Sequence, residues 1–152
     1  DKSQGVRFMK NSIGGEGATK LAQNESWKCF TKLDLSWNDI SDQGATGLAK
    51  NCSWTSPDIL NLRENNTAFE GAVALSKNES WVRLAELILS KNTIGAKGAR
   101  ALGKFGVSGL IVKSIEDEGA VGLEENISWT KLEVLSFEVN GIGAKGAIRL
   151  DI

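Results

Sequence analysis

Three glycines near the end of the chain have the spacing of a nucleotide-binding loop. Gly141, Gly143 and Gly146 form the pattern G-x-G-x-x-G within the segment VNGIGAKG. In a dinucleotide-binding fold, this pattern lets a pyrophosphate approach the N-terminus of a helix. The segments KNTIGAKG and WNDISDQG repeat the same turn, but Thr93 and Asp39 replace its first glycine. A phosphate loop is a single special site, so this recurring turn indicates a structural element and we reject the nucleotide site.

The other residues that could do chemistry also have simpler explanations. The acidic run 116–118 could suggest a metal site or an acid/base pair with Lys113, but it precedes an expected helix, whose N-terminus favours negative charge. Cys29 and Cys52 belong to no C-x-x-C pair, so we expect ordinary thiols in or near the core. The chain contains no His, which excludes within it the catalytic and zinc sites that depend on imidazole. We therefore expect no enzyme, no cofactor and no metal.

The length and the net charge of the chain narrow the class of function further. The 152 residues fit one domain, and the hydrophobic share of 41% is close to that of an ordinary soluble protein. A net charge of -1 gives no basic field that would attract nucleic acid or an anionic membrane. No apolar run approaches the ~18 residues of a membrane span. We expect neither a nucleic-acid partner nor a membrane span.

The elements that carry these residues repeat along the chain. Similar segments begin at Asn11, Asn38, Asn65 and Asn92, each 27 residues after the one before. Alternating apolar residues such as Leu33 and Leu35 precede the asparagine, which is typical of a strand with one buried face. The i, i+3, i+4 spacing that follows it, in Gly44-Ala45 and Leu48, is typical of a helix. Stacked units of this size bury a parallel sheet against a layer of helices.

The pattern L-x-x-L-x-L-x-x-N-x-I, followed by G-A-x-x-L, resembles the leucine-rich repeat family. It looks most like the ribonuclease-inhibitor-like subclass, and LAELILSKNTIGAKGARAL, residues 84–102, is the best match. Thr67 departs from the pattern because it replaces the isoleucine of its turn. The resemblance covers residues 3–152 and implies an α/β solenoid of about six coils, with a curved parallel sheet on the concave face and helices on the convex face. It also implies a recognition role inside cells, so we expect a cytoplasmic protein, with a secreted or cell-surface protein as the alternative.

The coil near residues 103–113 and the two ends depart from the regular repeat. Gly98 and Gly119 are 21 residues apart instead of 27, and Lys113 takes the asparagine position. We treat residues 1–152 as a single solenoid segment without recognisable terminal caps. Val6 and Leu150 already stand in core positions near the ends. We therefore expect further repeats or another chain to cover the solenoid ends.

Two further sets of residues keep the repeat interval. The asparagines at the strand ends can bond the backbone of their own turn and of the next coil, which predicts a buried ladder. The tryptophans after the helices share one register and predict a packed core row. The first set is Asn11, Asn38, Asn65, Asn92 and Asn140, and the second is Trp27, Trp54, Trp81 and Trp129.

Five asparagines begin an N-x-[ST] sequence, the acceptor pattern for glycosylation. Four of them follow the expected helices, where an Asn in the left-handed conformation can end the helix before a Ser turn. In a secreted protein, the same residues would carry a row of sugars along one edge. The five are Asn24, Asn51, Asn65, Asn78 and Asn126.

The outward strand positions are free to vary and offer a binding surface. Trp37 stands outside the core tryptophan register, and we place it on the outward side of the second strand, flanked by Arg7, Arg63 and Glu64. An exposed tryptophan on a concave sheet is a common anchor for a protein partner, and incidental exposure is the alternative. We also assign Ser36, Ser90 and Val112 to outward positions. The residues expected to contact a partner are Arg7, Met9, Asp34, Trp37, Arg63, Glu64, Ile88 and Lys91.

Two functions fit these observations. The first is a non-enzymatic scaffold that holds a protein or peptide on the concave sheet face. The second is a structural component of a cell surface or filament, which packs against copies of itself and carries N-linked glycans. The mass of the native protein separates the two, because only the second requires glycans.

Overall fold

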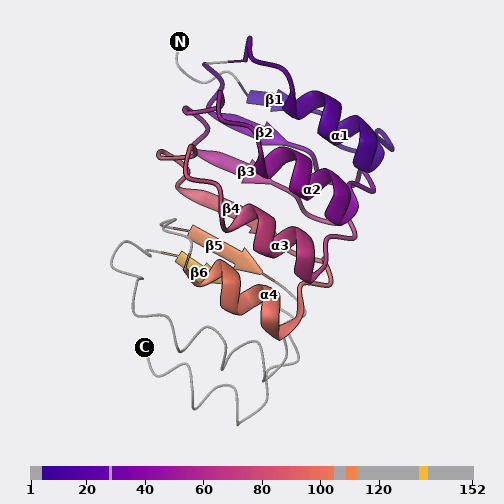
Figure 1. Ribbon diagram of the computed structural model, residues 1–152, viewed down its shortest axis with the longest axis vertical. Coiled ribbons are helices and arrows are strands. Elements are labelled where there is room, and N and C mark those ends of the chain that lie inside the picture. The colour runs from indigo at the N-terminus through magenta and orange to yellow at the C-terminus, as the bar shows by residue number, and fades with distance from the viewer. Residues whose placement is uncertain (1–4, 28, 105–108, 113–133, 137–152) are drawn as a thin grey trace.

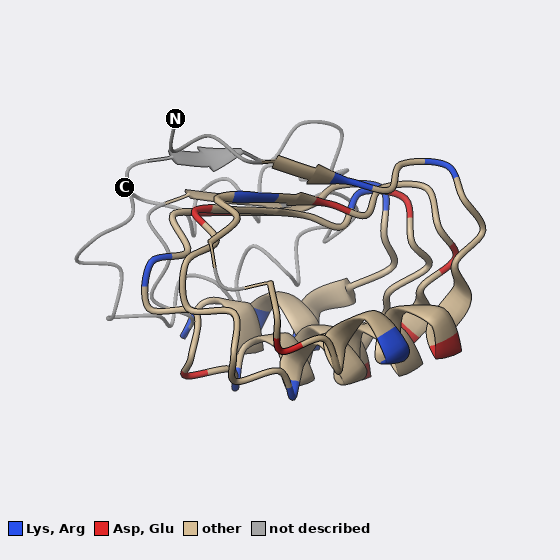
Figure 2. Ribbon diagram, turned by 90° about the horizontal axis from the view of Figure 1, so that it is seen from above, with Lys and Arg blue, Asp and Glu red and all other residues tan. Residues whose placement is uncertain are grey.

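The computed structural model describes residues 5–27, 29–104, 109–112 and 134–136. In these ranges, short strands and helices alternate along the chain as the repeat predicts. The strands are β1 (Gly5–Arg7), β2 (Lys32–Asp34), β3 (Ile59–Asn61), β4 (Glu86–Leu89), β5 (Gly109–Val112) and β6 (Val134–Ser136). The helices are α1 (Gly14–Ala22), α2 (Ser41–Ala49), α3 (Phe69–Leu75) and α4 (Gly95–Leu102). The strands stack in chain order (Figure 1), and the view from above shows the sheet as one layer and the helices as another (Figure 2).

The sheet is parallel and aligns equivalent residues of successive coils. Its order is β1-β2-β3-β4-β5-β6, so each strand pairs with the strand of the next coil. The middle residues of the strands form one row across the sheet, and Leu33, Leu60, Leu87 and Leu110 in this row are buried. No coil could bury its strand alone, and the neighbouring coils supply the missing core. The α/β repeat solenoid predicted from the sequence is confirmed.

Successive helices pack closely on one another and on the turns that precede them, because a glycine lies at each contact from α1 to α4. Ile94 is buried at the turn that leads into α4, and its Cγ2 lies 2.5 Å from where a Cβ on Gly98 would stand. The same Cβ would lie 3.1 Å from the Cβ of Ala72 in α3. A side chain at this position would therefore push α4 away from both the turn and the neighbouring helix. The repeated glycines therefore allow neighbouring coils to stack closely.

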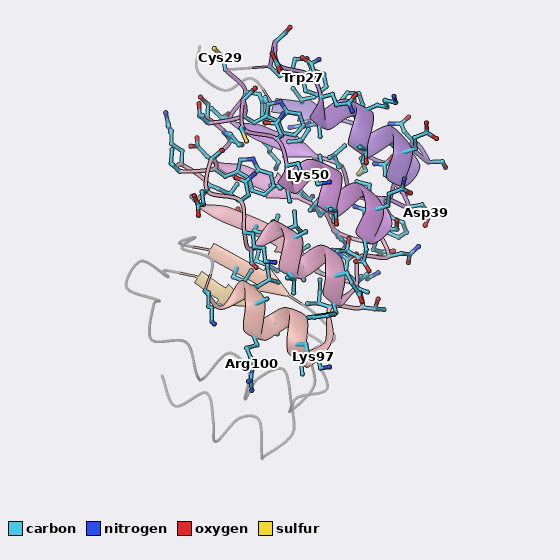
Figure 3. The ribbon with its side chains drawn as sticks, viewed as in Figure 1. Trp27, Cys29, Asp39, Lys50, Lys97 and Arg100 are labelled. Carbon is cyan, nitrogen blue, oxygen red and sulfur yellow. The ribbon has the colours of Figure 1, made fainter. Side chains whose placement is uncertain are left out.

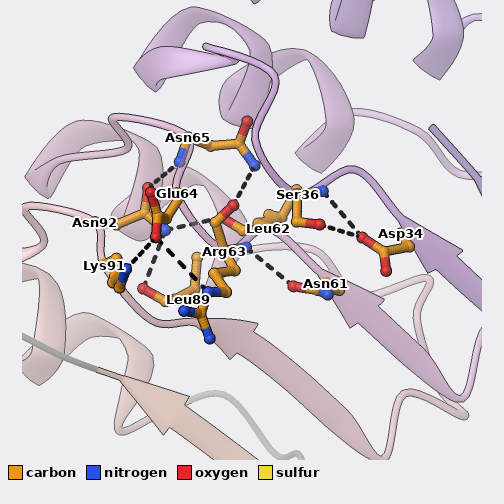
Figure 4. Close-up of polar contacts among 10 residues, drawn as sticks. All are labelled: Asp34, Ser36, Asn61, Leu62, Arg63, Glu64, Asn65, Leu89, Lys91 and Asn92. Carbon is orange, nitrogen blue, oxygen red and sulfur yellow. Dashed lines mark hydrogen bonds and ion pairs between the residues drawn. The ribbon is translucent and has the colours of Figure 1, made fainter. Parts of the chain in front are cut away.

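Buried asparagines join successive coils where the strands end. Asn65 Oδ1 accepts hydrogen bonds from the backbone N–H groups of Asn38, at 3.0 Å, and Ile40, at 3.3 Å. Its Nδ2 donates to the carbonyl oxygen of Leu35 at 2.8 Å. Asn38 makes the equivalent bonds one coil earlier. Asn92 makes them one coil later, and Figure 4 shows it beside Asn65. The predicted ladder is confirmed over these coils, but its acceptor bonds run to the preceding coil rather than to the next.

Three tryptophans pack as a row in the core. Trp54 and Trp81 are buried, and Trp27 is half-buried against the same cluster. The rings of Trp27 and Trp54 are stacked with centroids 6.0 Å apart, and Phe30 meets Trp54 edge to face at 5.4 Å. The predicted core row is confirmed for these three residues, while Trp129 lies outside the described residues.

The fifth strand pairs in a register that differs from the sequence prediction. Leu110 pairs with Leu87 and Ile111 pairs with Ile88, a shift of 23 residues, whereas the glycine spacing predicted 21. This register places Leu110 in the buried leucine row, where it is 1% exposed. Val112 pairs with Leu89; the structure does not describe the side chain of Val112, so its outward position stays a prediction. Lys113 lies outside the described residues.

Candidate functional site

The outward strand positions form two rows across the sheet, which we call the open sheet face. The inward row between them is almost uniformly leucine, whereas the outward rows change chemistry from coil to coil. Packing therefore constrains the inward row, and the outward rows are available for binding. One row is Arg7, Asp34, Asn61, Ile88 and Ile111, and the other is Gly5, Lys32, Ile59, Glu86 and Gly109. Arg7, Asp34 and Ile88 of the expected contact residues share the first of these rows.

Beside the open sheet face, the turns after the strands present a third row of side chains. Lys10, Trp37, Glu64 and Lys91 occupy one repeat position, and we call them the turn row. All four have left-handed backbone, with φ values of 60°, 60°, 53° and 58°. This conformation is unfavourable for bulky residues, and hydrogen bonds between coils stabilise it. The N–H of Trp37, for example, donates to the carbonyl oxygen of Arg63 at 3.0 Å.

Trp37 lies exposed among charged neighbours in the turn row. It is 41% exposed and borders a small hollow of about 260 Å³ that Asp39, Glu64 and Lys91 also line. The ammonium groups of Lys10 and Lys91 lie 5.1 Å and 5.5 Å from the centroid of its ring. Cations at this distance are attracted by the ring. Trp37 is therefore an exposed aromatic side chain whose ring attracts cations and whose backbone is fixed by the turn.

Glu64 is the acidic centre of the same region. Its Oε1 lies 2.5 Å from Lys91 Nζ and 3.8 Å from Arg63 Nε (Figure 4). These ion pairs hold the side chain of Lys91 between Glu64 and the ring of Trp37. The structure thus brings together Trp37, Arg63, Glu64 and Lys91, four of the eight residues expected to contact a partner.

Two details of the predicted surface are wrong. Trp37 lies in the turn, three residues after β2 ends at Asp34, and not on the outward side of the strand. The backbone of Trp37 is left-handed, so the chain turns away from the strand direction after β2. The ring of Trp37 then has the ammonium groups of Lys10 and Lys91 as charged neighbours. Ser36 and Ser90 are buried rather than outward-facing. The Ser36 hydroxyl donates to Asp34 Oδ1 at 2.6 Å and closes the turn.

Met9 and Arg63 occupy the same repeat position as the two serines, but their side chains are more exposed. Met9 is exposed beyond the end of β1, and Arg63 is half-buried. The backbone N–H of Arg63 donates to Asn61 Oδ1 at 3.0 Å, which repeats the bond from the backbone N–H of Ser36 to Asp34 Oδ1 at 3.0 Å. Larger side chains at this position therefore extend past the turn, while the small serines are covered by it.

The asparagines of the N-x-S sequences have a structural role. Asn51 and Asn78 are buried, and their Nδ2 atoms donate to backbone carbonyl groups of the preceding coil. The Oδ1 of Asn78 accepts from the N–H groups of Ser80, at 2.8 Å, and Trp81, at 3.0 Å. Neither asparagine has the left-handed backbone that we predicted for a helix end, because the side chain rather than the backbone closes the turn. A second asparagine ladder explains the sequence pattern.

The hydrogen bonds of the asparagine side chains disfavour glycosylation at three of the five N-x-[ST] sequences. A glycan is attached to Nδ2, the atom that Asn51, Asn65 and Asn78 use for buried hydrogen bonds. Attachment would remove those bonds and require the side chain to leave the core. Asn24 is half-buried, and its Oδ1 accepts from the N–H of Ser26 at 2.8 Å. Asn126 lies outside the described residues. The geometry disfavours a row of sugars at these three buried positions.

The described residues hold no cluster suited to a metal ion. No group of three or more His, Cys, Asp or Glu side chains converges within them. Cys29 and Cys52 are both free and exposed, which corrects the prediction that they lie in or near the core. Cys52 follows the ladder residue Asn51, whose side chain faces the core, so the thiol points away from it. The acidic run 116–118 lies outside the described residues.

A comparison with known protein families finds matches at two of the coils. The model for the Leucine Rich repeat matches residues 28–49, which contain β2 and α2, and residues 84–103, which contain β4 and α4. The two matches support a leucine-rich repeat family. Leucine-rich repeats generally serve as protein-binding scaffolds, so the family suggests this class of function. No curated protein matches the chain. The ribonuclease-inhibitor-like subclass stays a prediction.

No helix in the described ranges is long and apolar enough to cross a membrane. The expected contact residues also omitted Lys10, Asp39 and Asn66, which lie around Trp37 in the structure. Asn66 Nδ2 donates to Asp39 Oδ1, and Lys10 approaches the Trp37 ring. The repeat register had already placed Lys10 among the outward positions, because it occupies the same repeat position as Trp37, Glu64 and Lys91.

Proposed function

We propose that this protein is a non-enzymatic scaffold that holds a protein or peptide partner against the open sheet face and the adjoining turn row. The observation that carries the proposal is the contrast between the rows of the sheet. The inward row keeps leucine in the core, whereas the outward rows place charged, amide and apolar side chains at equivalent positions. Core packing does not require this variation, so the outward rows are free to be matched to one particular partner.

The chemistry of the surface supports a partner with both apolar and charged groups. Ile88 and Ile111 are half-buried neighbours in one outward row, and Ile59 is half-buried in the other row. Arg7 lies at the first strand, and Trp37 lies at the edge as an exposed aromatic anchor. Interfaces commonly combine an apolar centre with a polar rim, and tryptophan and arginine are frequent hot spots in them.

Site-directed photo-crosslinking tests the proposal. A photoreactive benzoylphenylalanine replaces Ile88 on the open sheet face or Trp37 in the turn row, and each variant is irradiated in an extract of the source organism. Val82, which is 78% exposed between α3 and β4, is the control position. We expect the same protein to be crosslinked from positions 37 and 88 and not from position 82. Crosslinking from position 82 alone would contradict the proposal.

A further inference from the structure

The helical side of the molecule carries an apolar groove that is separate from the open sheet face. The groove lies between α3 and α4 and has a volume of about 490 Å³. Phe69 and Val73 of α3 and Ala96 and Ala101 of α4 line its floor. Phe69 is 38% exposed, so a large part of an aromatic ring faces solvent here. The small alanines of α4 leave the space open beside the ring.

Three cations border this groove. Lys97 and Arg100 extend from α4 (Figure 3), and Lys104 lies two residues past the last residue of that helix, Leu102. The Nζ of Lys97 lies 5.9 Å from the centroid of the Phe69 ring. The intervals of three and seven residues place the cations along one side of the helix, and they spread over about 10 Å. Positive charge therefore runs alongside the apolar floor.

The other coils show that this chemistry is not a requirement of the repeat. The position of Lys97 is occupied by Glu16, Gln43 and Glu70 in the three preceding coils. The position of Val73 is occupied by threonine in the first two coils, and that of Phe69 by glycine and aspartate. The equivalent hollow between α1 and α2, of about 750 Å³, is lined by polar side chains that include Asp42. Of these two hollows, the later one combines an exposed aromatic side chain with basic residues at the positions of Lys97 and Arg100, while the position of Lys104 is a lysine, Lys50, in the earlier hollow as well.

We propose that this groove binds an acidic amphipathic segment of a partner protein. Apolar side chains of that segment would fill the floor beside Phe69, and its carboxylates, three or four residues apart, would face Lys97 and Lys104. A lipid surface fits less well, because the acidic residues Glu16 and Glu70 are exposed on the same helical layer and would repel anionic headgroups. The groove is a second binding surface, independent of the open sheet face.

Fluorescence anisotropy with a designed peptide tests this proposal. The probe is a labelled helical peptide with leucines on one face and glutamates at the i, i+4 and i+7 positions beside them, titrated with the full chain. Lys97→Glu restores the residue type of the first and third coils and should weaken binding at least about tenfold, a change of about 1.4 kcal/mol. The matched control Lys20→Glu, at an exposed lysine of α1, should leave binding unchanged. Thermal melts by circular dichroism establish that both variants fold like the parent chain.

A charge swap makes the test specific. A probe with lysines in place of the glutamates should bind the Lys97→Glu chain better than it binds the parent chain. The proposal is overturned if the parent chain does not bind the acidic probe, or if Lys97→Glu and Lys20→Glu affect it equally. It is also overturned if vesicles containing phosphatidylserine bind in a Lys97-dependent manner while the peptide does not. None of these results bears on the open sheet face, which the crosslinking experiment tests separately.

Discussion

Replacement of Asn65 by alanine should destabilise the solenoid far more than the same replacement at Asn11. The two residues occupy the same repeat position, but Asn65 is fully buried and Asn11 is exposed. Asn65 Oδ1 is the acceptor for the N–H groups of Asn38 and Ile40. The side chain of Asn11 donates only to carbonyl groups of its own turn, those of Phe8 and Met9. The pair therefore isolates the contribution of the bonds between coils.

The magnitude follows from the groups that lose a partner. The carbonyl groups that Asn65 binds keep other donors, since Leu35 accepts from Asn38 Nδ2 and Arg63 accepts from the N–H of Trp37. The N–H groups of Asn38 and Ile40 lose their acceptor. A buried unsatisfied group costs about 1–3 kcal/mol, so Asn65→Ala should lower the free energy of unfolding by about 4 kcal/mol. Asn11→Ala should lower it by less than about 1 kcal/mol, as a surface substitution does.

Urea unfolding, followed by circular dichroism and tryptophan fluorescence, measures both values. The two variants should unfold with similar m-values, because each exposes nearly the same surface as the parent chain. A difference of less than about 1 kcal/mol between them would refute the reasoning, since it would mean that the buried ladder contributes no more than an exposed turn.

Three further predictions concern the core and the asparagine ladders. Trp54→Ala should lower the free energy of unfolding by about 3–5 kcal/mol in the same assay, because Trp54 is buried and stacks on Trp27. A loss below about 1 kcal/mol would contradict the core position of Trp54. Thr67→Val should raise the free energy of unfolding by about 1 kcal/mol, because Thr67 Oγ1 is buried without a hydrogen-bond partner among the described residues. A lower midpoint of unfolding in urea would show that the Thr67 hydroxyl does have a hydrogen-bond partner. Mass spectrometry of peptides from the native protein should find Asn51 and Asn78 unglycosylated, because their Nδ2 atoms donate hydrogen bonds within the core. A glycan on either residue would favour the cell-surface alternative.

The repeat made the core of this protein predictable from its sequence. The 27-residue interval aligns each residue with its neighbour in the next coil, so the buried leucines, the ladder at Asn38, Asn65 and Asn92, and the row of Trp27, Trp54 and Trp81 could all be identified. Each of these features depends on stacking, and stacking follows from the interval alone.

The turn that carries the candidate site was harder to predict. Alternation of apolar residues does not show that β2 ends at Asp34, and so Ser36 and Trp37 were placed on the strand. The left-handed backbone of Trp37 is decided by a hydrogen bond to the next coil and not by the residue type, which disfavours it. The register of β5 was also mispredicted: Leu110 pairs with Leu87 rather than with Leu89, and because both leucines are buried, burial alone does not distinguish the two registers.

The dissociation constant of the crosslinked partner tests the central claim most directly. Trp37→Ala should weaken binding by about 30-fold or more, since loss of a hot-spot residue costs at least ~2 kcal/mol, while leaving the midpoint of unfolding nearly unchanged. Val82→Ala, at the exposed position between α3 and β4, is the matched control and should bind like the parent chain. If Trp37→Ala binds the partner as tightly as Val82→Ala does, Trp37 is not an anchor and the open sheet face with its turn row is not the binding surface.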